Sequence, residues 1–206
     1  MATPLTIAEL KAKARWRVPK MFFDYADSGA WTEGTYKANE ADFAAIKLRQ
    51  RVLVDMTNRS LESTMIGEKV SMPVALAPTG LTGMQHADGE ILAAQAAEAA
   101  GVPFTLSTMS VCSIEDVATH TAKPFWFQLY VMKDREFVKS LINRARVAGC
   151  SALVLTLDLQ VLGQRHKDIR NGLSTPPKFI PKHIWQVATR PQWAFEMLGT
   201  KRRSFG

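Results

Sequence analysis

The pattern of apolar and polar positions over about the first fifty residues predicts helices. Apolar positions recur at helical spacing in three stretches, each preceded by a residue able to begin a helix. These stretches are IAELKAKARW after Thr6, MFFDYADSGA after Pro19 and ending at Gly29, and EGTYKANEADFAAI capped by Thr32. SLESTM and GEKVSM then form a hairpin-like pair whose short turn contains Gly67. We therefore treat residues 1–71 as an N-terminal unit of helices and a hairpin.

A repeating unit begins at residue 72. Continuous apolar runs, typical of buried strands, alternate with amphipathic stretches typical of helices. The runs occupy residues 73–79, 103–108, 124–130 and 152–158, so their starts lie 30, 21 and 28 residues apart. That spacing is close to the ~30 residues of a βαβ unit. The pattern predicts a parallel sheet covered by helices across residues 72–158.

Two features favour a TIM-type (β/α)8 barrel over a doubly wound open sheet. No glycine-rich nucleotide fingerprint follows any of the runs. Each run ends in polar residues, and the carboxyl ends of barrel strands meet at one mouth, where active sites lie. These polar ends are Thr79, Ser107 with Thr108, Gln128 with Tyr130, and Thr156 with Asp158.

Only about four of the eight strands of a barrel are visible. After Asp158 the strand pattern stops, and residues 159–206 contain four prolines but no further strand-like run. We expect a variable loop segment there, and an unclosed edge on the sheet. We also expect the natural polypeptide to continue past Gly206 with four more β/α units.

Composition places the chain among ordinary soluble globular proteins, with 47% hydrophobic and 22% charged residues. No run approaches the ~18 apolar residues of a transmembrane helix. The N-terminus lacks the apolar core of a secretory signal. Cys112 and Cys150 have neither metal-type spacing nor a disulfide framework, so we expect packing cysteines, no metal and a cytoplasmic setting.

The net charge of +7 is concentrated at one end. Residues 176–206 hold six basic residues and one acid, Glu196, which accounts for +5 of the +7. Because the rest of the chain is nearly neutral, we expect no nucleic-acid binding, which needs a basic stripe across the domain. The aromatic residues Phe179, Trp185, Trp193 and Phe195 lie among these charges. Such a composition is typical of a segment on an anionic membrane surface, with a flap over the mouth or a subunit contact as the alternative.

Five motifs occur in order from about Lys20 onward: FDYADSGA, SMPVALAPTGL, TLSTMS, WFQLYVMKDR and LTLDLQVLGQRHKDIRNGL. Together they resemble the FMN-dependent 2-hydroxy-acid dehydrogenase and oxidase family, to which glycolate oxidase belongs, and most of all its bacterial membrane-associated L-lactate dehydrogenases. The resemblance implies FMN as cofactor, a small L-2-hydroxy acid such as L-lactate as substrate, and a quinone or other membrane electron acceptor. It also implies a homo-oligomer, a tetramer in the family, that is peripheral on the cytoplasmic face of the inner membrane through residues 176–206.

The resemblance also implies roles for individual residues. The residues implied to lie against the isoalloxazine ring or to bind its polar edge are Ala77, Pro78, Thr79, Ser107, Gln128 and Thr156. Those implied for the substrate are Tyr25 and Arg165, on its carboxylate, and Tyr130, which faces the hydroxyl and is the one catalytic candidate in the chain. Hydroxyls and an amide match the donors and acceptors of a flavin edge. A planar guanidinium can grip a carboxylate through two parallel bonds.

Simpler readings exist for each of these residues. Hydroxyls often end strands, Tyr25 could be a packing aromatic, and Arg165 could be a solvated charge within QRHKDIR. The four histidines do not match the family's catalytic position, so we expect His86, His120, His166 and His183 to be structural or on the surface.

The resemblance places the catalytic histidine, the lysine near flavin N1, a second carboxylate-binding arginine and the phosphate site in the second half of the barrel. We therefore expect this chain to be inactive alone. Other possibilities are the same chemistry on mandelate or glycolate, oxygen as acceptor, or a catalytically silent half-barrel that binds a partner. An FMN-dependent isomerase is disfavoured by Tyr25 with Arg165, which point to a carboxylate substrate.

Overall fold

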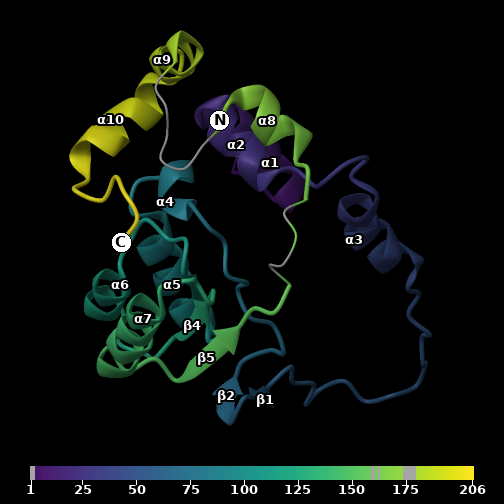
Figure 1. The fold of residues 1–206 in the computed structure, drawn as a ribbon. Coiled ribbons are helices and arrows are strands. Elements are labelled where there is room, and N and C mark those ends of the chain that lie inside the picture. The colour runs from purple at the N-terminus through teal and green to yellow at the C-terminus, as the bar shows by residue number, and fades with distance from the viewer. Residues whose placement is uncertain (1–2, 159–160, 162, 174–179) are drawn as a thin grey trace.

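The computed structural model describes residues 3–158, 161, 163–173 and 180–206 of the chain (Figure 1). It begins with the helices α1 (Ile7–Arg17), α2 (Lys20–Ala26) and α3 (Gly34–Ala45). The predicted cap of α1 is confirmed, since the Thr6 hydroxyl accepts a hydrogen bond from the backbone N–H of Glu9. α2 is shorter than predicted and ends at Ala26, three residues before Gly29.

The start of α3 differs from the prediction. Its N-cap is Glu33, in the left-handed region with φ of 61°, and not Thr32. The Glu33 N–H closes a turn onto the carbonyl of Ala30 at 2.9 Å, so the helix can begin only after that turn is complete. A favourable capping side chain at Thr32 is outweighed by this local turn.

The predicted hairpin is present. Its strands are β1 (Ser63–Met65) and β2 (Glu68–Val70), which pair antiparallel. Gly67 in the turn has φ of 80°, a conformation that glycine adopts without the steric cost of a side chain.

The main sheet contains β3 (Thr105–Ser107), β4 (Trp126–Leu129) and β5 (Ala152–Leu155), all parallel and in that order. The first predicted strand, residues 73–79, contributes a single parallel bridge between Leu76 and Phe104 instead of a full strand. Neighbours in the sheet therefore follow chain order from Leu76 to β5. A doubly wound sheet reverses its strand order at a switch point, whereas a barrel does not. The sheet is the first part of a TIM-type barrel, as predicted.

Helices on the outer face form the main core. They are α5 (Gly89–Ala100), α6 (Ile114–His120) and α7 (Arg135–Val147), preceded by the short α4 (Thr82–Gln85). α6 begins with a capping box in which Ser113 and Asp116 each bond the other's backbone N–H. The core between helices and sheet includes Leu106 and Phe127, both almost fully buried.

The last segment is more ordered than the loop predicted for residues 159–206. Its described residues contain α8 (His166–Asn171), α9 (Pro181–Ala188) and α10 (Pro191–Gly199). Prolines occupy the first turn of α9 and α10, a position that needs no backbone N–H donor, so these prolines begin helices instead of breaking them.

α10 packs against the N-terminal helices in a second, smaller core. The Trp193 ring stacks on Phe22 with centroids 5.6 Å apart, and its Nε1 donates to the carbonyl of Met84 at 2.9 Å. Trp193 is buried, which corrects its prediction as a membrane-facing aromatic. Trp185 and Phe195 are exposed, and Phe179 lies outside the described residues.

The tail after α10 returns to the barrel helices. Arg202 lies between two carboxylates, with Nη1 3.0 Å from Asp88 Oδ1 and Nε 2.8 Å from Asp116 Oδ1. These carboxylates raise the pKa of Arg202 further above its ordinary value. Arg202 is thus a structural clamp, and not one of the free cations predicted for this segment.

Candidate functional site

Three of the predicted cofactor residues meet at the carboxyl ends of the strands. Ser107 and Gln128 are partners in the β3–β4 register, and Thr156 follows β5 directly. The Ser107 hydroxyl donates to Gln128 Oε1 at 3.2 Å, and Gln128 Nε2 donates to Thr156 Oγ1 at 2.6 Å. These side chains form one continuous hydrogen-bonded row, which we call the polar row.

The direction of the hydrogen bonds in the polar row is set by the backbone. The N–H groups of Thr108 and Met109 can only donate, and they bond Gln128 Oε1 at 3.3 Å and Ser107 Oγ at 3.1 Å. The Gln128 amide must therefore present its oxygen to the Thr108 N–H and the Ser107 hydroxyl, and its nitrogen to Thr156. Thr156 accepts that bond, and its own proton has no acceptor among the described residues. A donor left over at the end of a buried row fits a ligand with carbonyl oxygens, as the polar edge of a flavin has.

Ala77, Pro78 and Thr79 lie beside this row on the neighbouring chain segment, and all three are exposed. The Thr79 hydroxyl makes just one contact, a 3.4 Å bond to the carbonyl of Ala77. An exposed backbone with an almost uncommitted hydroxyl suits a planar ring laid against it.

Tyr25 reaches the same strand ends from α2. A Cβ atom built on Gly80, directly after Thr79, would lie 2.8 Å from the Tyr25 hydroxyl, so a larger residue there would have to displace this hydroxyl. Burial is the main cause that raises the pKa of Tyr25, with Arg165 opposing it and Tyr130 adding to it. The structure thus brings Tyr25, Tyr130 and Arg165 near one another at the mouth.

The Nη2 and Nε atoms of the Arg165 guanidinium have partners among the described residues, and Nη1 has none. Its Cζ lies 4.8 Å from the centre of the Tyr25 ring. Nη2 donates to the carbonyl of Tyr25 and to Ser28 Oγ, the latter at 2.8 Å, and Nε is 2.9 Å from Asp168 Oδ2. Nη1 has no partner among the described residues. A substrate carboxylate can therefore be met by Nη1, and the two-pronged grip expected from the sequence is not available while Nη2 is bound to α2.

Sequence reasoning missed the residues that hold these groups. Burial raises the pKa of Asp168, although the adjacent Arg165 opposes the shift. Thr108 donates to the Gln128 carbonyl at 2.5 Å and accepts from the Tyr130 N–H at 3.1 Å, which fixes the start of the Tyr130 loop. The sequence shows Thr108 only as a polar strand end without a role, and Asp168 carries no sequence signal beyond its position near Arg165.

Glu90 is a further residue that the sequence did not single out. It lies in the first turn of α5, where an acid normally interacts with solvent and the helix dipole, yet it is 1% exposed. Its Oε1 accepts from the Val111 N–H at 3.0 Å, and Met109 in the same loop accepts from the Leu81 N–H at 2.9 Å. Glu90 therefore supports the loop on which the Gly80–Leu81 turn rests. Burial, followed by this carboxylate, raises the pKa of the Cys112 thiol to about 12, which marks it as an inert packing cysteine.

The histidines lie apart from the polar row. Nε2 of His86 lies 3.4 Å from Nη2 of Arg17, and the ring of His166 packs edge-on against Trp31. His120 and His183 each contact a backbone carbonyl at 2.7 Å, that of Asp116 and that of Asn171 respectively. Among the described residues, no group of three His, Cys, Asp or Glu side chains could hold a metal ion.

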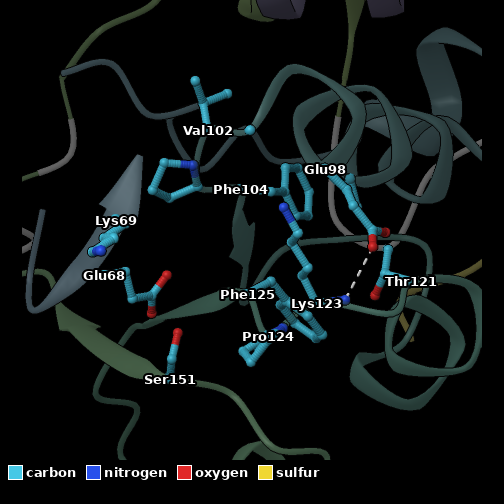
Figure 2. Close-up of a pocket in the computed structure, with 13 residues that line it drawn as sticks. Glu68, Lys69, Glu98, Val102, Phe104, Thr121, Lys123, Pro124, Phe125 and Ser151 are labelled. Atoms are coloured by element: carbon cyan, nitrogen blue, oxygen red, sulfur yellow. Dashed lines mark hydrogen bonds between the residues drawn. The ribbon is translucent and has the colours of Figure 1, made fainter. Parts of the chain in front are cut away.

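A cavity of about 320 Å³ occurs at the opposite end of the strands (Figure 2). It is lined by residues that precede or begin β3, β4 and β5, including Pro103, Pro124 and Ser151. Glu98 in its lining accepts the backbone N–H of Lys123, the dashed line in Figure 2, and also that of Ala122. Barrel chemistry is located at the carboxyl ends of strands, so this cavity is not the candidate site.

The chain resembles known proteins along nearly its whole length. The FMN-dependent dehydrogenase family pattern matches residues 14–205. An L-lactate dehydrogenase of Ectopseudomonas mendocina (strain ymp) is 49% identical over 189 residues, covering 92% of this chain and 50% of that protein.

Two solved structures extend the comparison. The monotopic membrane protein (S)-mandelate dehydrogenase superposes with a TM-score of 0.91 at 33% identity, covering 100% of this chain and 55% of its own. A lactate oxidase of Pediococcus acidilactici gives a TM-score of 0.80 at 31% identity, covering 86% and 50%. The chain spans about half the length of these relatives. From the family match and the shared fold, the chain belongs to the FMN-dependent dehydrogenase family.

Proposed function

We propose that this chain is the half-barrel that binds the flavin edge and part of the substrate in an enzyme oxidising L-lactate to pyruvate. The observation that carries the proposal is the polar row of Ser107, Gln128 and Thr156, with Tyr25 and Arg165 beside it. FMN is the cofactor of the family, and the unused Thr156 proton and the exposed 77–79 backbone fit its ring.

The reaction removes two electrons and two protons from the 2-hydroxy acid. FMN, when bound, supplies the acceptor for the electron pair. Arg165 Nη1 and the Tyr25 hydroxyl orient the substrate carboxylate, and Tyr130 faces its hydroxyl group. Ser107 and Gln128, both buried, keep the Thr156 donor fixed so that little rearrangement accompanies the reaction.

The proton acceptor is assigned to the second half of the barrel. The described histidines contact groups outside the polar row, as given above, so none is placed to take the proton from a substrate at this mouth. The phosphate of FMN is likewise assigned to the second half. The chain alone is therefore proposed to be inactive.

L-lactate is the favoured substrate because the 49% identical relative bears that activity in its name. The mandelate dehydrogenase and lactate oxidase relatives make an aryl substrate, or oxygen as acceptor, the alternatives. The silent half-barrel is disfavoured by the polar row, since a purely structural partner has no need of a partly buried hydroxyl whose proton has no acceptor among the described residues.

Membrane association is part of the proposal. Ile184 and Trp185 of α9 and Phe195 and Leu198 of α10 are exposed, and the mandelate dehydrogenase relative is described as monotopic. Among the described residues, no helix combines the length and apolarity that a membrane crossing requires. We propose peripheral contact through α9 and α10, on the cytoplasmic face, with a membrane quinone as acceptor and a homo-oligomeric assembly.

The test uses the completed barrel, meaning this chain joined to the C-terminal half of the Ectopseudomonas mendocina relative. Turnover of L-lactate, mandelate and glycolate is measured with a soluble dye, a quinone analogue and oxygen as acceptors. Preference for L-lactate with the quinone analogue is expected. Stoichiometric FMN without turnover of any 2-hydroxy acid would refute the proposal.

A further inference from the structure

An apolar stripe runs along the outside of α1. Ala8, Ala12 and Trp16 are spaced by four residues, which places them on one face of the helix, and Leu5, just before the N-cap Thr6, lines the same groove as Ala12 and Trp16. All four are exposed, and the large ones are strongly so, at 87% for Leu5 and 78% for Trp16. We call these four residues the α1 stripe.

Two uncommitted cations flank the α1 stripe. Lys13 lies beside it on the side facing α10, and Arg15 lies on the other side with Ala8 and Trp16. Neither makes a hydrogen bond or ion pair among the described residues. Other basic residues of α1 are paired, since Lys11 Nζ lies 2.6 Å from Asp27 and Arg17 bonds Glu196.

The α1 stripe borders a groove shared with α10. The groove has a volume of about 670 Å³, and its lining includes the basic Lys13 and Arg17, one acid, Glu9, the apolar Leu5 and Trp16, and, across from them, Gln192. The pair between Arg17 and Glu196 holds α1 and α10 side by side. α10 also exposes Phe195, one turn after Gln192, so the stripe continues the apolar surface of α10.

We propose that α1 is a second membrane-contacting element, and that the α1 stripe and its groove face an anionic phospholipid bilayer. This rests on the peripheral placement proposed above and extends it from α9 and α10 to the N-terminal helix. Leucine and tryptophan suit the boundary between headgroups and acyl chains, and Lys13 and Arg15 suit lipid phosphates. A protein partner is the alternative, since tryptophan and arginine are also enriched in protein interfaces, and the test below separates the two.

The test is co-sedimentation of the completed barrel with vesicles of phosphatidylglycerol and phosphatidylcholine, or of phosphatidylcholine alone. Trp16→Glu is expected to weaken binding to the mixed vesicles about tenfold or more, because it removes a large apolar group and adds repulsion. Lys13→Glu with Arg15→Glu is expected to weaken binding to the mixed vesicles roughly tenfold, with little change on phosphatidylcholine.

Val147→Glu is the matched control, since Val147 is equally exposed and ends α7, which packs against α6 and β4. It is expected to bind as the parent does. L-lactate oxidation with a soluble dye is measured for every variant and is expected to be unchanged, which shows that folding and the catalytic proposal are intact.

The outcomes separate this inference from the proposed function. If Phe195→Glu loses vesicle binding and Trp16→Glu does not, the α1 proposal is overturned while α10 keeps its role. If neither variant loses binding, both membrane proposals fail. If Trp16→Glu alters the oligomer mass in light scattering and leaves vesicle binding intact, the stripe is a protein contact and the inference is wrong.

Discussion

The centre and the edge of the sheet place the same kind of residue in opposite surroundings. Leu129 of β4 and Leu155 of β5 are direct partners in the parallel register, yet Leu129 is 2% exposed and Leu155 is 50% exposed. Helices cover the outer face of β4, and no described residue covers that of β5 to the same extent. Burial in this fold is therefore decided by the next β/α unit and not by the strand itself.

The long segment between α3 and β1 also leaves apolar side chains exposed. It runs away from the body of the molecule in Figure 1 and exposes Leu48, Val52 and Leu53. Apolar surface of this extent is unusual on a monomeric domain and marks an interaction site. Both regions match the proposal that a second half-barrel packs on this one.

The largest expected effect is on the free energy of unfolding, when a leucine is truncated at the centre or at the edge of the sheet. Leu129→Ala should lower the free energy of unfolding of the completed barrel by about 2–5 kcal/mol, because it empties a packed site. Leu155→Ala should cost a similar amount in the completed barrel and less than about 1 kcal/mol in this chain alone, where the side chain is half exposed. Urea denaturation of both variants in both backgrounds measures this. Equal costs in the two backgrounds would show that no second half covers β5.

The second prediction concerns Arg165 and its proposed contact with the substrate carboxylate at the barrel mouth. Arg165→Lys should lower kcat/KM for the hydroxy acid by roughly ten- to a hundredfold, since one charge-assisted hydrogen bond contributes about 1.5–3 kcal/mol. A lysine keeps the charge but has a single nitrogen, so it lacks the planar fork that bonds α2 through Nη2 while Nη1 faces the mouth. Arg165→Met should cost more, with FMN content near normal. Steady-state kinetics with flavin absorbance measure both, and Arg170→Lys on the exposed face of α8 is the control. Loss of FMN in place of substrate affinity would contradict the role.

Gln128 tests the polar row. Gln128→Leu leaves the Thr108 N–H and the Ser107 hydroxyl without a buried acceptor, at a cost of about 1–3 kcal/mol. FMN affinity of the completed barrel should fall by about tenfold, as followed by flavin fluorescence during titration. Gln95→Leu, at an exposed glutamine of α5, should leave it unchanged. Unaltered affinity in Gln128→Leu would remove the row from the flavin site.

The smallest effect concerns the covering helices. The pair between Arg144 and Glu115, at 2.8 and 2.7 Å, lowers the pKa of Glu115 to about 2. Because the pKa of Glu115 is lower in the folded than in the unfolded protein, its ionised form stabilises the fold at pH values above about 4.5. This contribution is lost as the pH falls from about 4.5 to 2. Since Glu115 is half exposed, less than about 1 kcal/mol is expected. Glu115→Gln should flatten the pH dependence of unfolding in this window, and an unchanged slope would contradict it.

Much of the fold could be predicted because its signals are local. The cap at Thr6, the turn at Gly67 and the alternation of apolar runs with amphipathic helices all depend on neighbours in sequence. Thr32 shows the limit of this reasoning, since a turn closed onto Ala30 moved the helix start to Glu33.

The rest depends on partners far away in the chain. Trp193 is buried because Phe22 lies beneath it, and Arg202 is paired because Asp88 and Asp116 face it. In the candidate site, the strand ends identified the polar row. The commitment of Arg165 Nη2 to α2 and the burial of Glu90 follow from tertiary contacts that no spacing reveals.

The two attachments of the last segment have a consequence for how this enzyme can diversify. His183 is bonded to the Asn171 carbonyl at one end, and Arg202 is clamped between Asp88 and Asp116 at the other. The outward faces of α9 and α10 between these fixed points can accumulate substitutions without displacing the mouth. Under the proposed membrane contact, substitutions on these two faces change the lipid preference and leave the polar row in place.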